Sequence, residues 1–178
     1  MSKRNDFIWK SIQLVCWIIF AGYCVQTGAL IFNYIYSLFK PIATQNLHLG
    51  LDLSELYHRS KALYAFLFIV IIAVSAVKGY LFYLVIKVFK TLNLVKPFSE
   101  DVSVFISRIT YCACMIGLIS LAAHQFTKKL IEKGIDVSVV DRYWNDWGAY
   151  LMMSAILFVI SLIFKKGIAL QHENDLTI

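Results

Sequence analysis

The stretch ALYAFLFIVIIAVSAVKGYLFYLVIKVF occupies residues 62–89 and contains two charged side chains, Lys78 and Lys87. An α-helix rises about 1.5 Å per residue, so a helix of this length exceeds the roughly 30 Å thickness of a bilayer's hydrocarbon core. Inside lipid, only helices and closed barrels satisfy every backbone hydrogen bond. The stretch therefore predicts a membrane-spanning helix.

Three further apolar runs lie on either side of this stretch, at residues 11–38, 104–126 and 147–164. Together the four runs predict an all-α membrane protein with four transmembrane helices in a bundle. We expect a single membrane domain over residues 1–178, because the chain is too short to add a second folded domain. Residues 165–178 then form a tail beyond the last span.

The composition agrees with a membrane protein and excludes several other classes. Hydrophobic residues make up 60% of the chain and charged residues 16%, whereas soluble domains have roughly 45–50% and 25%. The net charge of +6 comes from Lys and Arg near the ends of the apolar runs, where they meet anionic headgroups. We therefore expect no direct nucleic-acid binding. The sequence contains no nucleophile–base constellation, phosphate-binding glycine loop or zinc-ligand spacing, so we expect no enzymatic activity, cofactor or metal.

The distribution of positive charge predicts the orientation. Nine Lys and Arg residues lie on the side that holds both termini and the second connection, and seven lie on the opposite side. Cytoplasmic loops carry the excess of positive charge. Both termini are therefore predicted to be cytoplasmic.

The first and third connections show an alternation of apolar and polar residues. Residues 47–54 read LHLGLDLS, and residues 135–139 read IDVSV. Alternation with a period of two favours half-buried strands. We expect the two connections to pair as a small two-stranded β cap outside the membrane, and irregular loops are the alternative.

Polar side chains within the spans are candidate functional groups: Lys78, His124, Gln26 and Asn33. No Asp or Glu occurs in the four predicted runs, so the sequence offers Lys78 no acidic partner inside the membrane. Lys78 then either extends its stem to the interface or lines an inward cavity that holds water or an anionic ligand. For His124 we expect polar packing, with Gln125 or Gln26 as its partner.

The second connection contains a short box formed by Pro97, Phe98, Ser99 and Glu100. Pro97 ends the preceding helix, Ser99 is a good N-cap, and Glu100 lies in a first turn where acids favour the helix dipole. The box is thus explained by structure alone. Its alternative role is part of a docking surface.

The chain ends in KKGIALQHENDLTI, residues 165–178. A membrane protein does not need a fixed polar terminus for stability, so stability alone does not explain this segment. Leu170 and Leu176 flank acidic residues and are typical of a short recognition peptide. Alternatively, the tail folds back on residues 97–108 and covers the inner face.

These two stretches together resemble the bacterial membrane-protein family called domain of unknown function 2975. The resemblance rests on the box and on these residues of the terminal segment: Gly167, Leu170, Gln171, Glu173, Asn174, Asp175, Leu176 and Thr177. It implies four spans, a location in the bacterial cytoplasmic (inner) membrane, and cytoplasmic termini. Lys78 is not part of the family pattern.

The resemblance also implies a function, because genes of this family often lie beside a gene for a small helix-turn-helix regulator. We expect a regulatory interaction protein that binds or sequesters such a regulator through residues 87–108 and 165–178. One alternative is a small transporter or channel subunit with a polar path through Lys78, Gln26 and Asn33, which would need a homo-oligomer to build a pore. Another is an accessory protein associated with lipid or quinone.

Overall fold

The computed structural model describes residues 3–92 and 98–175, with the side chains of residues 7–92 and 98–173. Within these residues the chain forms α-helices and short 3₁₀ helices. They are α1 (Lys3–Phe39), η1 (Pro41–Gln45), η2 (His48–Gly50), α2 (Ser54–Arg59), α3 (Lys61–Thr91), α4 (Glu100–Glu132), η3 (Ser138–Tyr143) and α5 (Trp147–Asp175).

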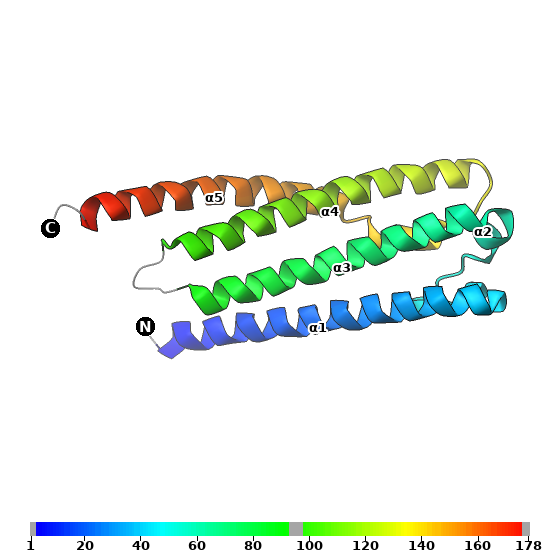
Figure 1. The fold of residues 1–178 in the computed structure, drawn as a ribbon, viewed down its shortest axis with the longest axis horizontal. Coiled ribbons are helices and arrows are strands. Elements are labelled where there is room, and N and C mark those ends of the chain that lie inside the picture. The colour runs from blue at the N-terminus through cyan, green and yellow to red at the C-terminus, as the bar shows by residue number, and fades with distance from the viewer. Residues whose placement is uncertain (1–2, 93–97, 176–178) are drawn as a thin grey trace.

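Four helices are long and apolar enough to cross a membrane, which confirms the four predicted spans. The long helices lie side by side in the order α1, α3, α4, α5, and each packs against the next (Figure 1). The central helices α3 and α4 bury far more of their side chains than the flanking helices α1 and α5. The apolar surfaces of α1 and α5 are therefore the main surfaces in contact with lipid.

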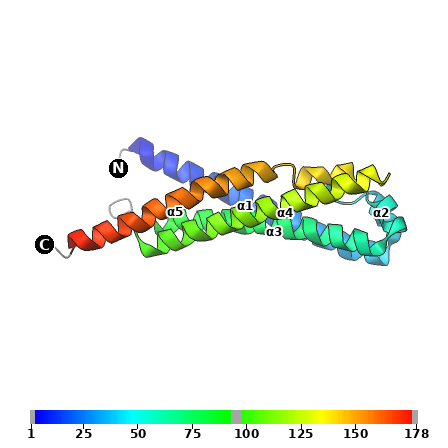
Figure 2. The same ribbon diagram turned by 90° about the horizontal axis from the view of Figure 1, so that it is seen from above.

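Both termini and the α3–α4 connection lie at one end of the molecule, and α2 lies at the other (Figure 1). We call these the inner end and the outer end, after the predicted orientation. A second view shows that α1 runs obliquely across the other helices (Figure 2). The 37 residues of α1 are long enough for such a tilt, because a helix longer than the hydrocarbon core tilts or protrudes.

The predicted β cap is wrong. The described residues of both outer connections contain no strand pair: they form η1, η2, α2 and η3, with one isolated bridge between Leu47 and Leu51. The alternation correctly indicates burial at three positions, because Leu47, Leu51 and Leu53 are buried. Leu49 breaks the pattern, because it is 62% exposed and adopts a positive φ of 59°. The buried Leu47 and Leu51 flank η2 with extended backbone and bridge to each other, so a single tight loop buries alternate leucines without a strand pair.

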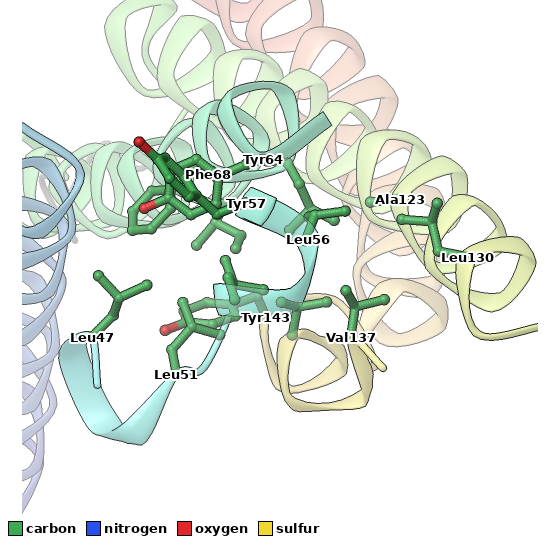
Figure 3. Packing of buried hydrophobic residues seen from close by; sticks show 14 of the residues in the cluster. Leu47, Leu51, Leu56, Tyr57, Tyr64, Phe68, Ala123, Leu130, Val137 and Tyr143 are labelled. Atoms are coloured by element: carbon green, nitrogen blue, oxygen red, sulfur yellow. The ribbon is translucent and has the colours of Figure 1, made fainter. Parts of the chain in front are cut away.

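The outer connections pack into an apolar cluster that also includes side chains of α1, α3 and α4. Leu51, Leu56 and Val137 are fully buried there, and Tyr143 lies between the outer connections (Figure 3). Tyr64 of α3 joins the cluster to α1 through a 2.6 Å hydrogen bond with Ser37. This cluster fixes η3 against the outer halves of α3 and α4.

The fourth span is discontinuous. From the outer end of α4 the chain returns along the bundle as η3, and α5 begins near the middle of the molecule (Figure 1). Residues 144–146 separate the two helical pieces. Broken helices are tolerated at membrane depth only where other groups satisfy the freed backbone, so this joint needs polar partners.

Helix α5 packs closely on α4 at a small residue. A Cβ added at Gly117 would lie 2.6 Å from Leu151 Cδ2 and 3.1 Å from the Leu151 backbone nitrogen. Ala113, one turn earlier, is fully buried. The spacing of Ala113 and Gly117 predicts such a packing face, and the Gly117–Leu151 contact confirms it.

Candidate functional site

Lys78 lies at the joint of the fourth span. It is the eighteenth of the 31 residues of α3, and its side chain is only 7% exposed. Its ammonium forms a 2.8 Å ion pair with Asp146 and donates a 3.1 Å hydrogen bond to the carbonyl of Tyr143. The same Nζ lies 5.1 Å from the ring centre of Tyr150. Lys78 thus satisfies the backbone freed at the end of η3 and holds the start of α5.

The groups around this ion pair come from separate parts of the chain. Tyr143, which offers its carbonyl, ends η3, Asp146 belongs to the joint and Tyr150 to the first turn of α5, whereas Lys78 belongs to α3. Tyr23 of α1 interacts with the side chain of Tyr150. This constellation ties α1, α3 and α5 together at one level of the bundle.

The structure corrects the expectation that Lys78 has no acidic partner. Asp146 lies one residue before Trp147, where the sequence predicts the fourth span to begin, and so it was counted outside the membrane. The signal that could have found it is physical: an ammonium inside an apolar run needs an anion. The acids closest to the ends of the other runs are the first candidates for that anion.

His124 also contacts the returning segment. Its Nδ1 lies 2.7 Å from Asp141 Oδ1, and both side chains are partly exposed. The sequence predicts Gln125 or Gln26 as the partner of His124, so Asp141 is a second acid that the sequence analysis missed. The pair joins α4 to η3 near the outer end.

Other polar contacts anchor the returning segment to the outer connections. Arg142 donates from Nη1 to the carbonyl of Leu49 at 2.9 Å, and Glu55 accepts from the backbone of Asp136 at 3.3 Å. Asp136 accepts two hydrogen bonds from Ser138, which lower the pKa of the Asp136 carboxyl. The segment before α5 is thus held at several points along its length.

Gln26 and Asn33 do not join the Lys78 constellation in the described part of the chain. Both lie half-buried on α1, and Asn33 donates to the carbonyl of Ala29 within its own helix. The three residues of the predicted polar path are therefore separate in the structure.

At the inner end, the box begins α4 as expected. Ser99 accepts from the backbone nitrogen of Val102 at 3.4 Å, and Glu100 lies in the first turn. Pro97 falls outside the described residues. Phe98 packs edge-on against Phe164 of α5.

The box and the terminal segment are in direct contact. A Cβ added at Gly167 would lie 2.5 Å from Phe98 Cδ1, so the ring of Phe98 rests on the backbone of α5. Beside this contact is an open groove of about 710 Å³. We call it the inner groove, and its lining residues are Phe98, Leu162, Ile163, Lys166, Gly167, Leu170 and Gln171.

The remaining predicted residues lie around this groove or beyond it. Glu100 lines a smaller hollow of about 300 Å³ on the other side of α5. Glu173 is exposed, and Asn174 and Asp175 complete α5. Leu176 is not among the described residues. The terminal segment thus continues α5 as a helix through Asp175, and it meets the box through the side of that helix.

Comparison with known proteins places the chain in a family. The sequence model described as "Protein of unknown function (DUF2975)" matches residues 48–178. The chain belongs to this family. The matched range includes the box, the terminal segment and the Lys78–Asp146 pair. No curated protein and no solved structure matches the chain. Membership and the four apolar helices together identify a multi-pass membrane protein of a family without an assigned function.

The described residues hold no group of three or more His, Cys, Asp or Glu that could bind a metal ion. The arrangement offers two other kinds of chemistry. One is a buried ion pair at a break in a span, and the other is an apolar groove with polar edges at the inner end.

Proposed function

We propose that this protein is a regulatory membrane protein that binds a soluble protein partner at its inner groove. The observation that carries the proposal is the contact of Phe98 with Gly167, because it joins two distant segments of the chain into one surface. Phe98, just before α4, and Gly167 on α5 meet there, at the end of the molecule that also holds both termini.

The shape of the groove suits a helical partner. Leu170, 60% exposed, lies on the part of α5 beyond Lys165 and Lys166, where the predicted span has ended. An exposed leucine in water beside an open apolar groove is typical of a site that accepts the apolar face of an amphipathic helix. Small helix-turn-helix regulators are built from such helices.

Exposed acids also lie at the inner end, on either side of a groove that is itself lined by Lys166. Glu100 and Asp101 are exposed in the first turn of α4, and Glu173 is exposed near the end of α5. DNA-binding proteins carry a basic surface that these acids would attract. A regulator held by that surface would be unable to bind DNA, so the proposal includes sequestration.

A pull-down from membranes tests the proposal. We would compare the full chain with a chain that ends at Leu170 and with Leu170→Asp, and identify the soluble proteins that co-purify. His172→Asp is the matched control, because it adds the same charge to an exposed position of the tail that does not line the groove. A small DNA-binding protein held by the full chain and His172→Asp, and lost from the other two, supports the proposal. Equal recovery by all four contradicts it.

A small oligomeric transporter or channel subunit is a second candidate, favoured by the discontinuous fourth span. Broken helices with charged residues at mid-membrane form the substrate sites of many transporters. The test is ion or solute flux into liposomes that contain the purified protein, with Lys78→Met as the variant. Flux that is independent of Lys78 removes the structural reason for this candidate.

A further inference from the structure

An apolar pocket of about 380 Å³ lies between α3 and α4 in their outer halves. It is lined by Phe66, Leu67, Val70, Ile119, Ala122, Ala123, Phe126 and Trp144. The segment η3 packs against both α3 and α4 beside the pocket. On α4, two alanines line the pocket.

The pocket is built on one side by the joint of the fourth span. Trp144 lines it, is fully buried, and directly follows Tyr143, whose carbonyl accepts from Lys78. At the rim, the rings of Phe66 and Phe126 meet edge-on with centres 5.6 Å apart. Phe66 is 54% exposed, so the pocket is continuous with the lipid-facing surface of the spans.

From this chemistry and position we propose that the pocket binds a single acyl chain of a phospholipid in the outer leaflet. All eight lining side chains are apolar or aromatic, so they recognise hydrocarbon and offer no site for a headgroup. Seven of them belong to the outer ends of the second and third predicted spans, where acyl chains surround the protein, and Trp144 belongs to the joint. The volume falls within the range of about 300–1,000 Å³ that is usual for ligand pockets.

This proposal does not depend on the proposed function at the inner groove. Trp144 lines the pocket but has no exposed surface, so its ring lies beneath the surface of the pocket. A chain inside the pocket lies closer to that ring than a chain on the lipid-facing surface does. The part of the Trp144 quenching that is lost when the pocket is filled therefore separates a bound chain from a surrounding one.

The experiment uses a chain whose other tryptophans are replaced, Trp9→Phe, Trp17→Phe and Trp147→Phe, in phosphatidylcholine liposomes with unlabelled or dibrominated acyl chains. We expect brominated chains to quench the fluorescence of Trp144. Adding Ala123→Leu, which fills the pocket, should remove most of the quenching. Ala155→Leu is the matched control, because Ala155 is exposed on α5 and does not line the pocket.

Absence of quenching in the Trp144 chain, or equal quenching with and without Ala123→Leu, would overturn the proposal. A second measurement avoids the substitutions altogether. The unaltered protein is reconstituted with a phospholipid that carries a photoreactive diazirine in its chain, and the labelled peptides are mapped. Label that is concentrated at residues 66–70 and 119–126, and that remains there in an excess of ordinary phospholipid, supports a bound chain. Uniform label along the exposed faces contradicts it.

Discussion

Breaking the Lys78–Asp146 pair should lower the free energy of unfolding by an amount that depends on which of the two residues is replaced. Asp146→Ala leaves an ammonium that is only 7% exposed, with the Tyr143 carbonyl and the Tyr150 ring as its remaining partners. Removing one member of a buried pair costs about 3–5 kcal/mol, because the other charge stays uncompensated. Lys78→Met leaves the carboxylate of Asp146, whose side chain is 39% exposed, so we expect a smaller loss of about 1–3 kcal/mol.

Replacing both residues removes the uncompensated charge. Apolar replacements of a buried ion pair are often neutral, so we expect Lys78→Met with Asp146→Leu to lie within about 1 kcal/mol of the original protein. The double variant should thus be more stable than Asp146→Ala. The free energy of unfolding is measured in mixed micelles by titration with sodium dodecyl sulfate, with helix content followed by circular dichroism.

Lys87→Met is the matched control, because it makes the same change on the same helix at an exposed lysine. Lys87 lies over the rings of Tyr83 and Phe105, so its loss should cost no more than about 1 kcal/mol. Asp146→Leu is also measured alone, so that it forms a double-mutant cycle with Lys78→Met. A coupling below about 0.5 kcal/mol between these two substitutions would refute the pairing argument. A larger loss for Lys78→Met than for Asp146→Ala would refute the argument from unequal burial.

Three further predictions concern two close helix contacts, at Gly167 and Gly117, and one surface acid, Asp136. Gly167→Ala places a Cβ 2.5 Å from the Phe98 ring, so it should cost about 1–3 kcal/mol and weaken partner capture, and adding Phe98→Leu should restore much of the unfolding free energy. Gly117→Ala should be destabilising by a similar amount, because its Cβ meets the backbone of α5 as well as a side chain. Gly148→Ala, with no atom within 4 Å of the new Cβ, should be neutral or stabilising in the same titration with sodium dodecyl sulfate. The pKa of Asp136 is lowered in the folded protein, so its contribution to stability is full above the unfolded pKa of about 3.9 and is lost as pH falls below that value. Asp136→Asn should therefore flatten the profile of unfolding free energy against pH below about pH 4. An unchanged profile would contradict this assignment.

The four spans could be predicted because hydropathy and length dominate a membrane fold. A helix of about 20 apolar residues crosses lipid with every backbone hydrogen bond made within the segment itself, so the length of the apolar runs left few alternatives. The outer connections were harder, because burial of alternate residues does not require a strand. Leu51 and Leu53 are buried between the short helices of the first connection, where single hydrogen bonds to Leu47 and Thr44 stand in place of a sheet.

The candidate site was predictable only where it depends on local sequence. Ser99 caps α4 as expected, because an N-cap is set by neighbouring residues. The partners of Lys78 and His124, by contrast, are acids in the segment that returns from α4 to the joint. A hydropathy profile treats that segment as a loop outside the membrane. It contains no information on how deep the segment lies, and depth decides which charges can meet.

The geometry of α5 suggests how an event at the joint would reach the inner groove. About 30 Å of uninterrupted helix separates Trp147 from Gly167, and the close contacts of α5 with Gly117 and Phe98 leave little freedom for it to bend between them. We expect a displacement at the joint to move α5 as one body and so to change the shape of the groove. A ligand shifts an equilibrium between two positions of α5 only when it binds one of them more tightly. The Lys78–Asp146 pair lies at the joint, so a change in this pair would shift that equilibrium. We expect the folded variant Lys78→Met with Asp146→Leu to capture a different amount of the soluble partner than the original protein, measured in the same pull-down. Equal capture would mean that the groove acts independently of the joint.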